Sequence, residues 1–173
     1  QVSIFTPRYL FFLSCGALMP LSAYGTKFKN TFSLCAGSVF CNMPVPYVQP
    51  VISASYSKMD SRESRYLDRA SIRIACVQAG ARYPYTLPFH GIRTARYAGV
   101  YAECTAGITW LNYSSNADGV INEVLFTPSV CAGVRVPVYS MFDVALEAGY
   151  TMLPTAGDNL QGITVRMAIG MGI

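Results

Sequence analysis

Strict alternation between two kinds of side chain is the feature that most constrains what this chain can fold into. In the last segment the apolar positions are Ile163, Val165, Met167, Ile169, Met171 and Ile173, and the positions between them are Thr164, Arg166, Ala168, Gly170 and Gly172. Successive side chains of a β-strand point to opposite faces, so a period of two residues predicts strands. One face of such a strand would be apolar, and the other would be small or polar.

The same alternation recurs along the chain and predicts eight strands. We expect them at Tyr9–Met19, Phe32–Cys41, Val48–Lys58, Ser71–Tyr85, Ala98–Trp110, Phe126–Val136, Phe142–Met152 and Ile163–Ile173. In the fourth segment the alternation shifts phase near Cys76 and Val77, which we interpret as a β-bulge. A bulge there would place Arg73 and Arg82 on the same polar face.

The first of these segments admits two interpretations. Residues 9–25 are uncharged, follow Arg8 and end in Ala23-Tyr24-Gly25, so they are similar to a secretory signal peptide. A closed bacterial barrel has an even number of strands, however, and residues 9–25 can supply the strand that makes the number even. We therefore expect one β-barrel domain over residues 1–173, with a tail over 1–8 and the first strand in 9–25.

Composition decides what the alternating faces meet. Charged residues are 13% of the 173, against about 25% in ordinary soluble domains, and hydrophobic residues are 52%. The less apolar face carries Gly, Ala, Ser and Thr rather than Lys and Glu, so it is too poor in charge for a water-exposed surface. We expect an all-β, eight-stranded antiparallel transmembrane β-barrel with the apolar face toward lipid. The alternative is a soluble lipocalin-like barrel that binds an apolar ligand inside, which needs the apolar faces inward.

Aromatic residues gather near both ends of the expected strands. One group is Tyr56, Trp110, Phe126 and Tyr150, and the other is Phe40, Tyr83, Tyr85 and Phe142. Transmembrane barrels carry aromatic belts at the two membrane interfaces, so we interpret the groups as such belts.

The connections also differ in character. Short turns are expected at Asn42–Tyr47, Thr86–Pro88 and Pro137–Met141, and longer polar loops at Met59–Arg69, Ser114–Asn122 and Pro154–Leu160. Short periplasmic turns and longer external loops are typical of these barrels. The charges around the first long loop are Lys58, Asp60, Arg62, Glu63, Arg65 and Arg69. They predict either a solvated loop or a surface that recognises a partner.

Ionisable side chains on the inward face are the candidate functional residues. They are Arg73, Arg82, Arg135 and Arg166 with Glu103, Asp143 and Glu147. An eight-stranded barrel is just wide enough for side chains to fill, and an unpaired buried ion costs several kcal/mol. We therefore expect an ion-pair network that closes the lumen. A gate that exchanges partners to pass water or small ions is the alternative.

Catalysis and nucleic-acid binding have little support. His90, the only histidine, lies in an expected periplasmic turn, away from the outer surface where barrel enzymes use a histidine, so no Ser-His-Asp triad is expected. Without a second histidine or a clustered set of thiolates, no metal or cofactor site is expected either. The net charge of +4 is small and scattered, so no nucleic-acid surface is expected. The six cysteines match no metal or redox motif and are expected to be small apolar fillers.

The segments GVRVPVYSMFDVALEAGYTMLP (133–154) and LQGITVRMAIGMGI (160–173) resemble the closing strands of small outer-membrane barrels. The group is the OmpA-like, OmpX-like and OmpW-like eight-stranded proteins. The resemblance implies a bacterial outer membrane, with its lipid and the barrel-assembly machinery as partners. It implies a non-enzymatic role in envelope integrity, or in contact with a host or ligand through external loops. An OmpW-like channel for small hydrophobic molecules is the alternative, with Pro128 and Pro137 interrupting the ladder of the sixth strand.

Overall fold

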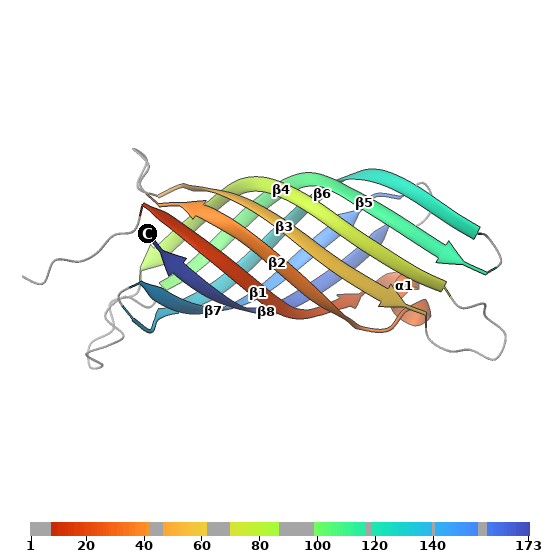
Figure 1. The fold of residues 1–173 in the computed structure, drawn as a ribbon, viewed down its shortest axis with the longest axis horizontal. Coiled ribbons are helices and arrows are strands. Elements are labelled where there is room, and N and C mark those ends of the chain that lie inside the picture. Colours follow the sequence, from red (N-terminus) through yellow and green to blue (C-terminus); the bar gives the residue numbers. More distant parts are fainter. Residues whose placement is uncertain are drawn as a thin grey trace, which may run out of the picture.

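The computed structural model describes residues 8–41, 47–61, 70–86, 99–116, 119–139, 141–155 and 159–173. The elements in these ranges are β1 (Tyr9–Pro20), α1 (Ser22–Lys27), β2 (Thr31–Phe40), β3 (Gln49–Asp60), β4 (Ala70–Thr86), β5 (Gly99–Ser115), β6 (Gly119–Pro137), β7 (Phe142–Leu153) and β8 (Leu160–Gly172). The strands form one closed barrel in sequence order (Figure 1). Among the described residues, no helix is long and apolar enough to cross a membrane.

Closure depends on β1, the segment for which the sequence left a strand and a signal peptide open. In the structure β1 is a strand that pairs antiparallel with β2 on one side and with β8 on the other. No sheet edge therefore remains at the junction of the first and last strands. A spanning sheet needs this closure, because lipid offers no partner to an unpaired backbone N–H or C=O.

The stagger of the strands sets their tilt and the width of the barrel. Following the pairing from Leu10 around all eight strands leads back to β1 at Pro20, ten residues further along. With strands ~4.8 Å apart, this stagger corresponds to a tilt of about 40°. The lumen of such a barrel is narrow enough for side chains to fill it.

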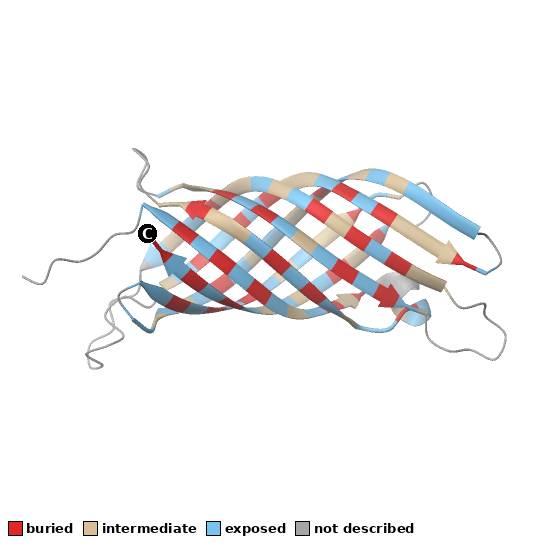
Figure 2. Ribbon diagram, viewed as in Figure 1, coloured by how far each residue is buried: buried red, intermediate tan, exposed pale blue. Residues whose placement is uncertain are grey.

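Apolar side chains cover the outside of the barrel, and buried residues alternate with exposed ones along each strand (Figure 2). Leu13, Val124 and Leu146 are 60–66% exposed on the outer wall. Inward positions hold small and polar side chains together with two clusters of buried apolar ones. The soluble lipocalin-like alternative required the apolar faces inward, and the structure has them outward.

The bulge expected near Cys76 and Val77 is absent, and the prediction was wrong. The register of β4 with both neighbouring strands runs unbroken from Ser71 onward. Regular alternation points Ile72, Ile74 and Cys76 inward, so Arg73 lies on the outer wall. The phase shift in the sequence arises because apolar residues occupy both faces of β4 at this point.

One connection also differs from expectation. The long loop predicted at Ser114–Asn122 is mostly strand, since β5 ends at Ser115 and β6 begins at Gly119. Gly119 has a φ of 76°, a left-handed conformation that suits a hairpin turn. The turn predicted around Thr86–Pro88 falls largely on residues 87–98, which lie outside the described residues.

Glycine at two inward positions lets neighbouring strands approach closely. A Cβ on Gly107 would lie 1.9 Å from the carbonyl oxygen of Val77, and a Cβ on Gly80 would lie 2.0 Å from that of Cys104. Both obstacles are backbone atoms of the adjacent strand, which cannot move aside without breaking the ladder. The close approach of β4 and β5 therefore requires these glycines.

We expect Gly107→Val to lower the free energy of unfolding by about 3 kcal/mol, because the side chain displaces the β4 backbone. The matched control is Ala106→Val, on the outer wall one residue away, with an expected change within about 0.5 kcal/mol. Urea unfolding in phospholipid vesicles, followed by the emission of Trp110, measures both. Equal midpoints for the two variants would show that β4 and β5 do not pack as described.

Candidate functional site

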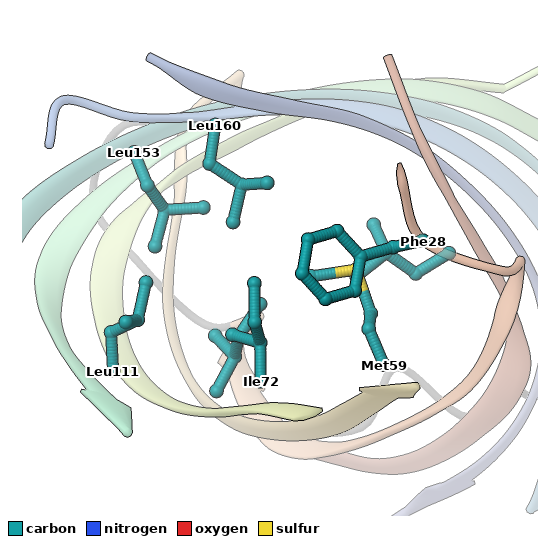
Figure 3. Close-up of a cluster of buried hydrophobic side chains, with 8 residues drawn as sticks. Phe28, Met59, Ile72, Leu111, Leu153 and Leu160 are labelled. Atoms are coloured by element: carbon teal, nitrogen blue, oxygen red, sulfur yellow. The ribbon is translucent and has the colours of Figure 1, made fainter. Parts of the chain in front are cut away.

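An apolar layer closes the lumen at the α1 end of the barrel. We call it the collar, and it consists of Leu18, Phe28, Met59, Ile72, Ile74, Leu111, Leu153 and Leu160 (Figure 3). Seven of these side chains come from six strands, and the eighth is Phe28, which follows α1 and forms an isolated β-bridge with Ser61. Each is at most 9% exposed. They surround the lumen from several sides, so apolar side chains dominate the interior at this end. Glu123, on the inward face of β6, is directly opposite Leu111.

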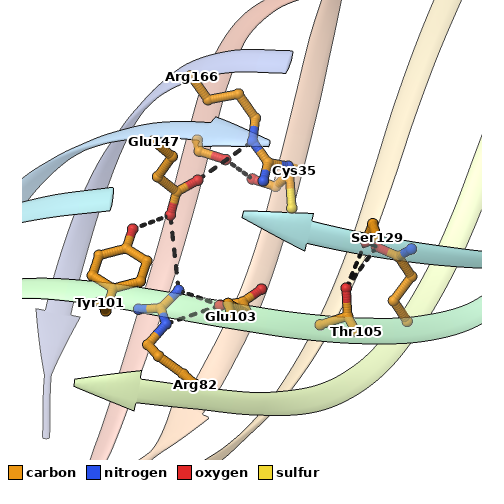
Figure 4. A network of polar contacts seen from close by, with 10 residues as sticks. Cys35, Arg82, Tyr101, Glu103, Thr105, Ser129, Glu147 and Arg166 are labelled. Carbon is orange, nitrogen blue, oxygen red and sulfur yellow. Dashed lines mark hydrogen bonds and ion pairs between the residues drawn. The ribbon is translucent and has the colours of Figure 1, made fainter. Parts of the chain in front are cut away.

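A cluster of charges lies further along the lumen, toward the end of the barrel where the C-terminus lies (Figure 1). We call Arg82, Tyr101, Glu103, Glu147 and Arg166 the charged cluster (Figure 4). Arg82 Nη2 lies 2.8 Å from Glu103 Oε2 and 3.8 Å from Glu147 Oε1. The Tyr101 hydroxyl donates to Glu147 Oε1 at 2.5 Å, and Arg166 Nε lies 3.4 Å from Glu147 Oε2. The ring of Tyr101 also lies under the Arg82 guanidinium, 4.1 Å from Cζ.

Register explains why these residues meet. Glu103 on β5 is directly opposite Arg82 on β4, and Arg166 on β8 is directly opposite Glu147 on β7. The contact between Arg82 and Glu147 then joins the two cross-strand pairs across the lumen. All four side chains are buried, the most exposed being Arg166 at 16%. The cluster therefore ties opposite walls of the barrel together.

Every arginine on the inward face of the described strands is paired with an acid. Two arginines face two glutamates in the charged cluster, and Arg135 pairs with Asp143 nearer the terminus end. The sequence prediction held a fourth lumen arginine, and the structure corrects it by placing Arg73 outside. The remaining three arginines pair with Glu103, Glu147 and Asp143, which is the arrangement that burial favours. A fourth acid, Glu123, lies half-buried on the inward face of β6.

Between the collar and the charged cluster lies a chamber lined by hydroxyl groups and by apolar side chains, among them Leu18, Met59 and Leu160 of the collar. The lining hydroxyls are Ser33, Ser53, Ser55, Ser57, Thr105, Thr109, Thr127, Ser129, Thr151 and Thr164. The cavity offers about 70 Å³ to the centres of water molecules, which is room for roughly five of them. Thr127 donates to Thr109 at 2.6 Å, and the Thr105 and Ser129 hydroxyls are 2.7 Å apart. The chamber therefore combines polar walls, which can hold water, with apolar ones.

Two parts of this site were missed by the sequence analysis. The alternation places Tyr101 on the inward face, but nothing in the sequence indicated that its hydroxyl would reach Glu147. The chamber was missed because its hydroxyls come from many strands, and only the register brings them to one level. The available signal was the run of Ser and Thr on the inward face of several strands.

All eight residues of the expected aromatic belts lie on strands with their side chains on the outer wall. Among them, Tyr85 and Phe126 are more than 60% exposed, and Phe40 packs edge-to-face with Tyr9 at 5.7 Å. The register, a ~3.4 Å rise and the ~40° tilt separate the centres of the two groups by about 22 Å along the axis. That separation is close to the ~25 Å apolar band of outer-membrane barrels.

The remaining candidates fall outside the lumen. Lys58 and Asp60 belong to β3 rather than to the loop, and their charged atoms are 3.2 Å apart. Arg62, Glu63, Arg65 and Arg69 lie outside the described residues, as does His90. Within the described ranges no three potential ligands form a metal site, and the six cysteines are not joined by disulfides.

Three solved structures are similar to this chain. Neisserial surface protein A has a TM-score of 0.68 at 9% identity, with 95% of this chain and 97% of that chain covered. The attachment invasion locus protein Ail of Yersinia pestis has a TM-score of 0.56 at 13% identity, covering 98% and 100%. Ail in complex with the heparin analogue sucrose octasulfate has a TM-score of 0.51 at 16% identity, covering 96% and 99%.

These similarities define the fold, which is that of the small eight-stranded outer-membrane barrels. No protein-family model matches the chain, and no curated protein matches its sequence. The resemblance expected from the last two strands is thereby confirmed at the level of architecture.

We expect Arg82→Gln to lower the free energy of unfolding by about 3–5 kcal/mol, because it leaves Glu103 buried without its cation. Arg73→Gln is the matched control, since it makes the same change on the outer wall of the same strand. Its effect should stay within about 0.5 kcal/mol. Urea unfolding in vesicles distinguishes the two variants, and an Arg73→Gln loss as large as that of Arg82→Gln would contradict the assignment of Arg73 to the wall.

Proposed function

We propose that this chain is a non-enzymatic protein of a bacterial outer membrane, with a barrel that does not conduct. Its role lies in envelope integrity and in contacts made at the rim of the barrel. The observation that carries the proposal is a lumen blocked at two levels by different chemistry. The collar excludes water and ions because it is apolar, and the charged cluster fills the section beyond the chamber.

Placement in the outer membrane is supported by the wall and by the structural neighbours. The outward strand faces are apolar between two groups of aromatic residues, as lipid contact requires. The neighbours include a surface protein of Neisseria and a Yersinia protein named for attachment and invasion. Those names support a contact role at the membrane surface. Insertion of such a barrel would depend on the barrel-assembly machinery.

The charged cluster favours a closed lumen over a gate. Glu147 interacts with Tyr101, Arg82 and Arg166 at the same time. Opening a path would separate at least one of these ions from its partners in a buried site, at a cost of several kcal/mol. Exchange of partners would also leave the collar in place, so movement of the charges alone does not open the barrel.

A lateral channel for small hydrophobic molecules is a second candidate, favoured by the seam between β6 and β7. β6 pairs with β7 only over Ser129–Pro137, and Pro128 lies at the end of this ladder. Residues 119–128 of β6 pair with β5 but have no partner on the β7 side among the described residues. A gap in the ladder at this level would open sideways into lipid.

Recording from planar bilayers tests the closed lumen. We expect a flat baseline after insertion of the wild-type protein, since the collar and the charged cluster both block the axis. Discrete current steps would overturn the proposal. Heat-unfolded protein added at the same concentration is the control for detergent leakage.

Uptake by vesicles tests the second candidate. A saturable flux of an apolar dye into vesicles that contain the protein, with no ionic current in the same preparation, would favour the lateral channel over a purely structural barrel. Flux equal to that of protein-free vesicles would rule out the lateral channel.

A further inference from the structure

Charges on the outer wall of the barrel are confined to one place. Among the described strand residues, three Asp, Glu, Lys or Arg side chains face outward. They are Lys58, Asp60 and Arg73. All three lie on β3 and β4 at the α1 end. Two more exposed cations lie near the same end of the barrel, namely Lys27, which ends α1, and Lys29.

Lys58 and Arg73 are directly opposite each other in the β3–β4 ladder. Like charges at such positions repel, because their side chains leave the same face of the sheet a few ångströms apart. Asp60 lies 3.2 Å from Lys58, and among the described residues Arg73 makes no ion pair. Among the described residues of β3 and β4, one acid facing two cations leaves an excess of positive charge that an external anion can neutralise.

The ladder places these cations at the boundary between polar and apolar wall. Lys58, Arg73, Asn112 and Asn122 are successive neighbours across four strands, and the Asn112 amide donates to Asn122 at 2.7 Å. Two residues along the strands, the corresponding row is Tyr56, Ala75, Trp110 and Val124. The polar row therefore lies next to an aromatic and apolar one, where lipid headgroups meet acyl chains.

We propose that Lys58 and Arg73 bind the phosphate of an anionic membrane lipid in the leaflet at the α1 end. This inference rests on the membrane placement proposed above. A guanidinium can hold a phosphate through two parallel hydrogen bonds, and the ammonium of Lys58 adds a point charge. The acyl chains of the same lipid would lie along Ala54 and Val77, which form the outward-facing row beyond Tyr56 and Ala75.

Trp110, the only tryptophan in the chain, provides a native reporter on this wall. It is 50% exposed and is the ladder neighbour of Ala75, two residues from Arg73. Bromine on lipid acyl chains quenches tryptophan on contact. The experiment compares quenching by brominated phosphatidylglycerol with quenching by brominated phosphatidylcholine, each diluted into unbrominated phosphatidylcholine vesicles that contain the folded protein.

We expect the brominated phosphatidylglycerol to compete for the wall about fivefold better than the brominated phosphatidylcholine. The double variant Lys58→Gln/Arg73→Gln should bring the ratio close to one, and Arg8→Gln, at the opposite end of the barrel, should leave it unchanged. A wild-type ratio near one, or a ratio unchanged in the double variant, would overturn the proposal. The wild-type ratio decides the matter even if the double variant does not fold.

Two further outcomes separate the sources of the phosphate and the two proposals. Loss of the preference in millimolar inorganic phosphate, but not in chloride of equal ionic strength, would assign the site to free phosphate instead of lipid. Equal quenching by both lipids would overturn the lipid site while leaving the membrane barrel intact. No quenching by either lipid would mean that Trp110 does not face lipid, and the proposed function would fail with the site.

Discussion

Hydrocarbon cannot accept or donate hydrogen bonds, so each backbone N–H and C=O of a spanning strand must find a partner within the protein. In this chain the pairing of β1 with both β2 and β8 meets that demand by joining the ends of the sheet. Closure with a ten-residue stagger then sets the narrow width of the lumen. The distribution of side chains follows, with apolar groups outside and small or polar groups inside.

A narrow lumen determines how charge is carried. Three arginines form ion pairs with three acids inside it, and the charged cluster joins two cross-strand pairs through Arg82 and Glu147. Burial makes each ion costly alone and well held when paired. The outer wall is under the opposite demand. Among the described strand residues its charges occur only at the α1 end, where Lys58 and Arg73 lie close to Trp110, at the level where we place the lipid headgroups.

Much of this architecture could be predicted from alternation, because the period of two residues indicates where the strands lie and which side chains point into the barrel. Arg166, Glu147 and Arg135 were assigned inward on that basis alone. Arg73 was misassigned because apolar residues fill both faces of β4 near Cys76, which hides the phase. Strand length was underestimated at β5 and β6, where polar residues such as Asn112 and Asn122 pair with each other beyond the apolar band. The partners of each charge depend on register, which no single strand encodes.

The central claim is a closed barrel with its apolar wall toward lipid, and electrophoretic mobility in SDS tests it most directly. Protein refolded in detergent is compared before and after boiling. A closed membrane barrel resists SDS until it is heated, so the two samples should run at different positions. A single position, equal to that of the unfolded chain in both samples, would contradict the account.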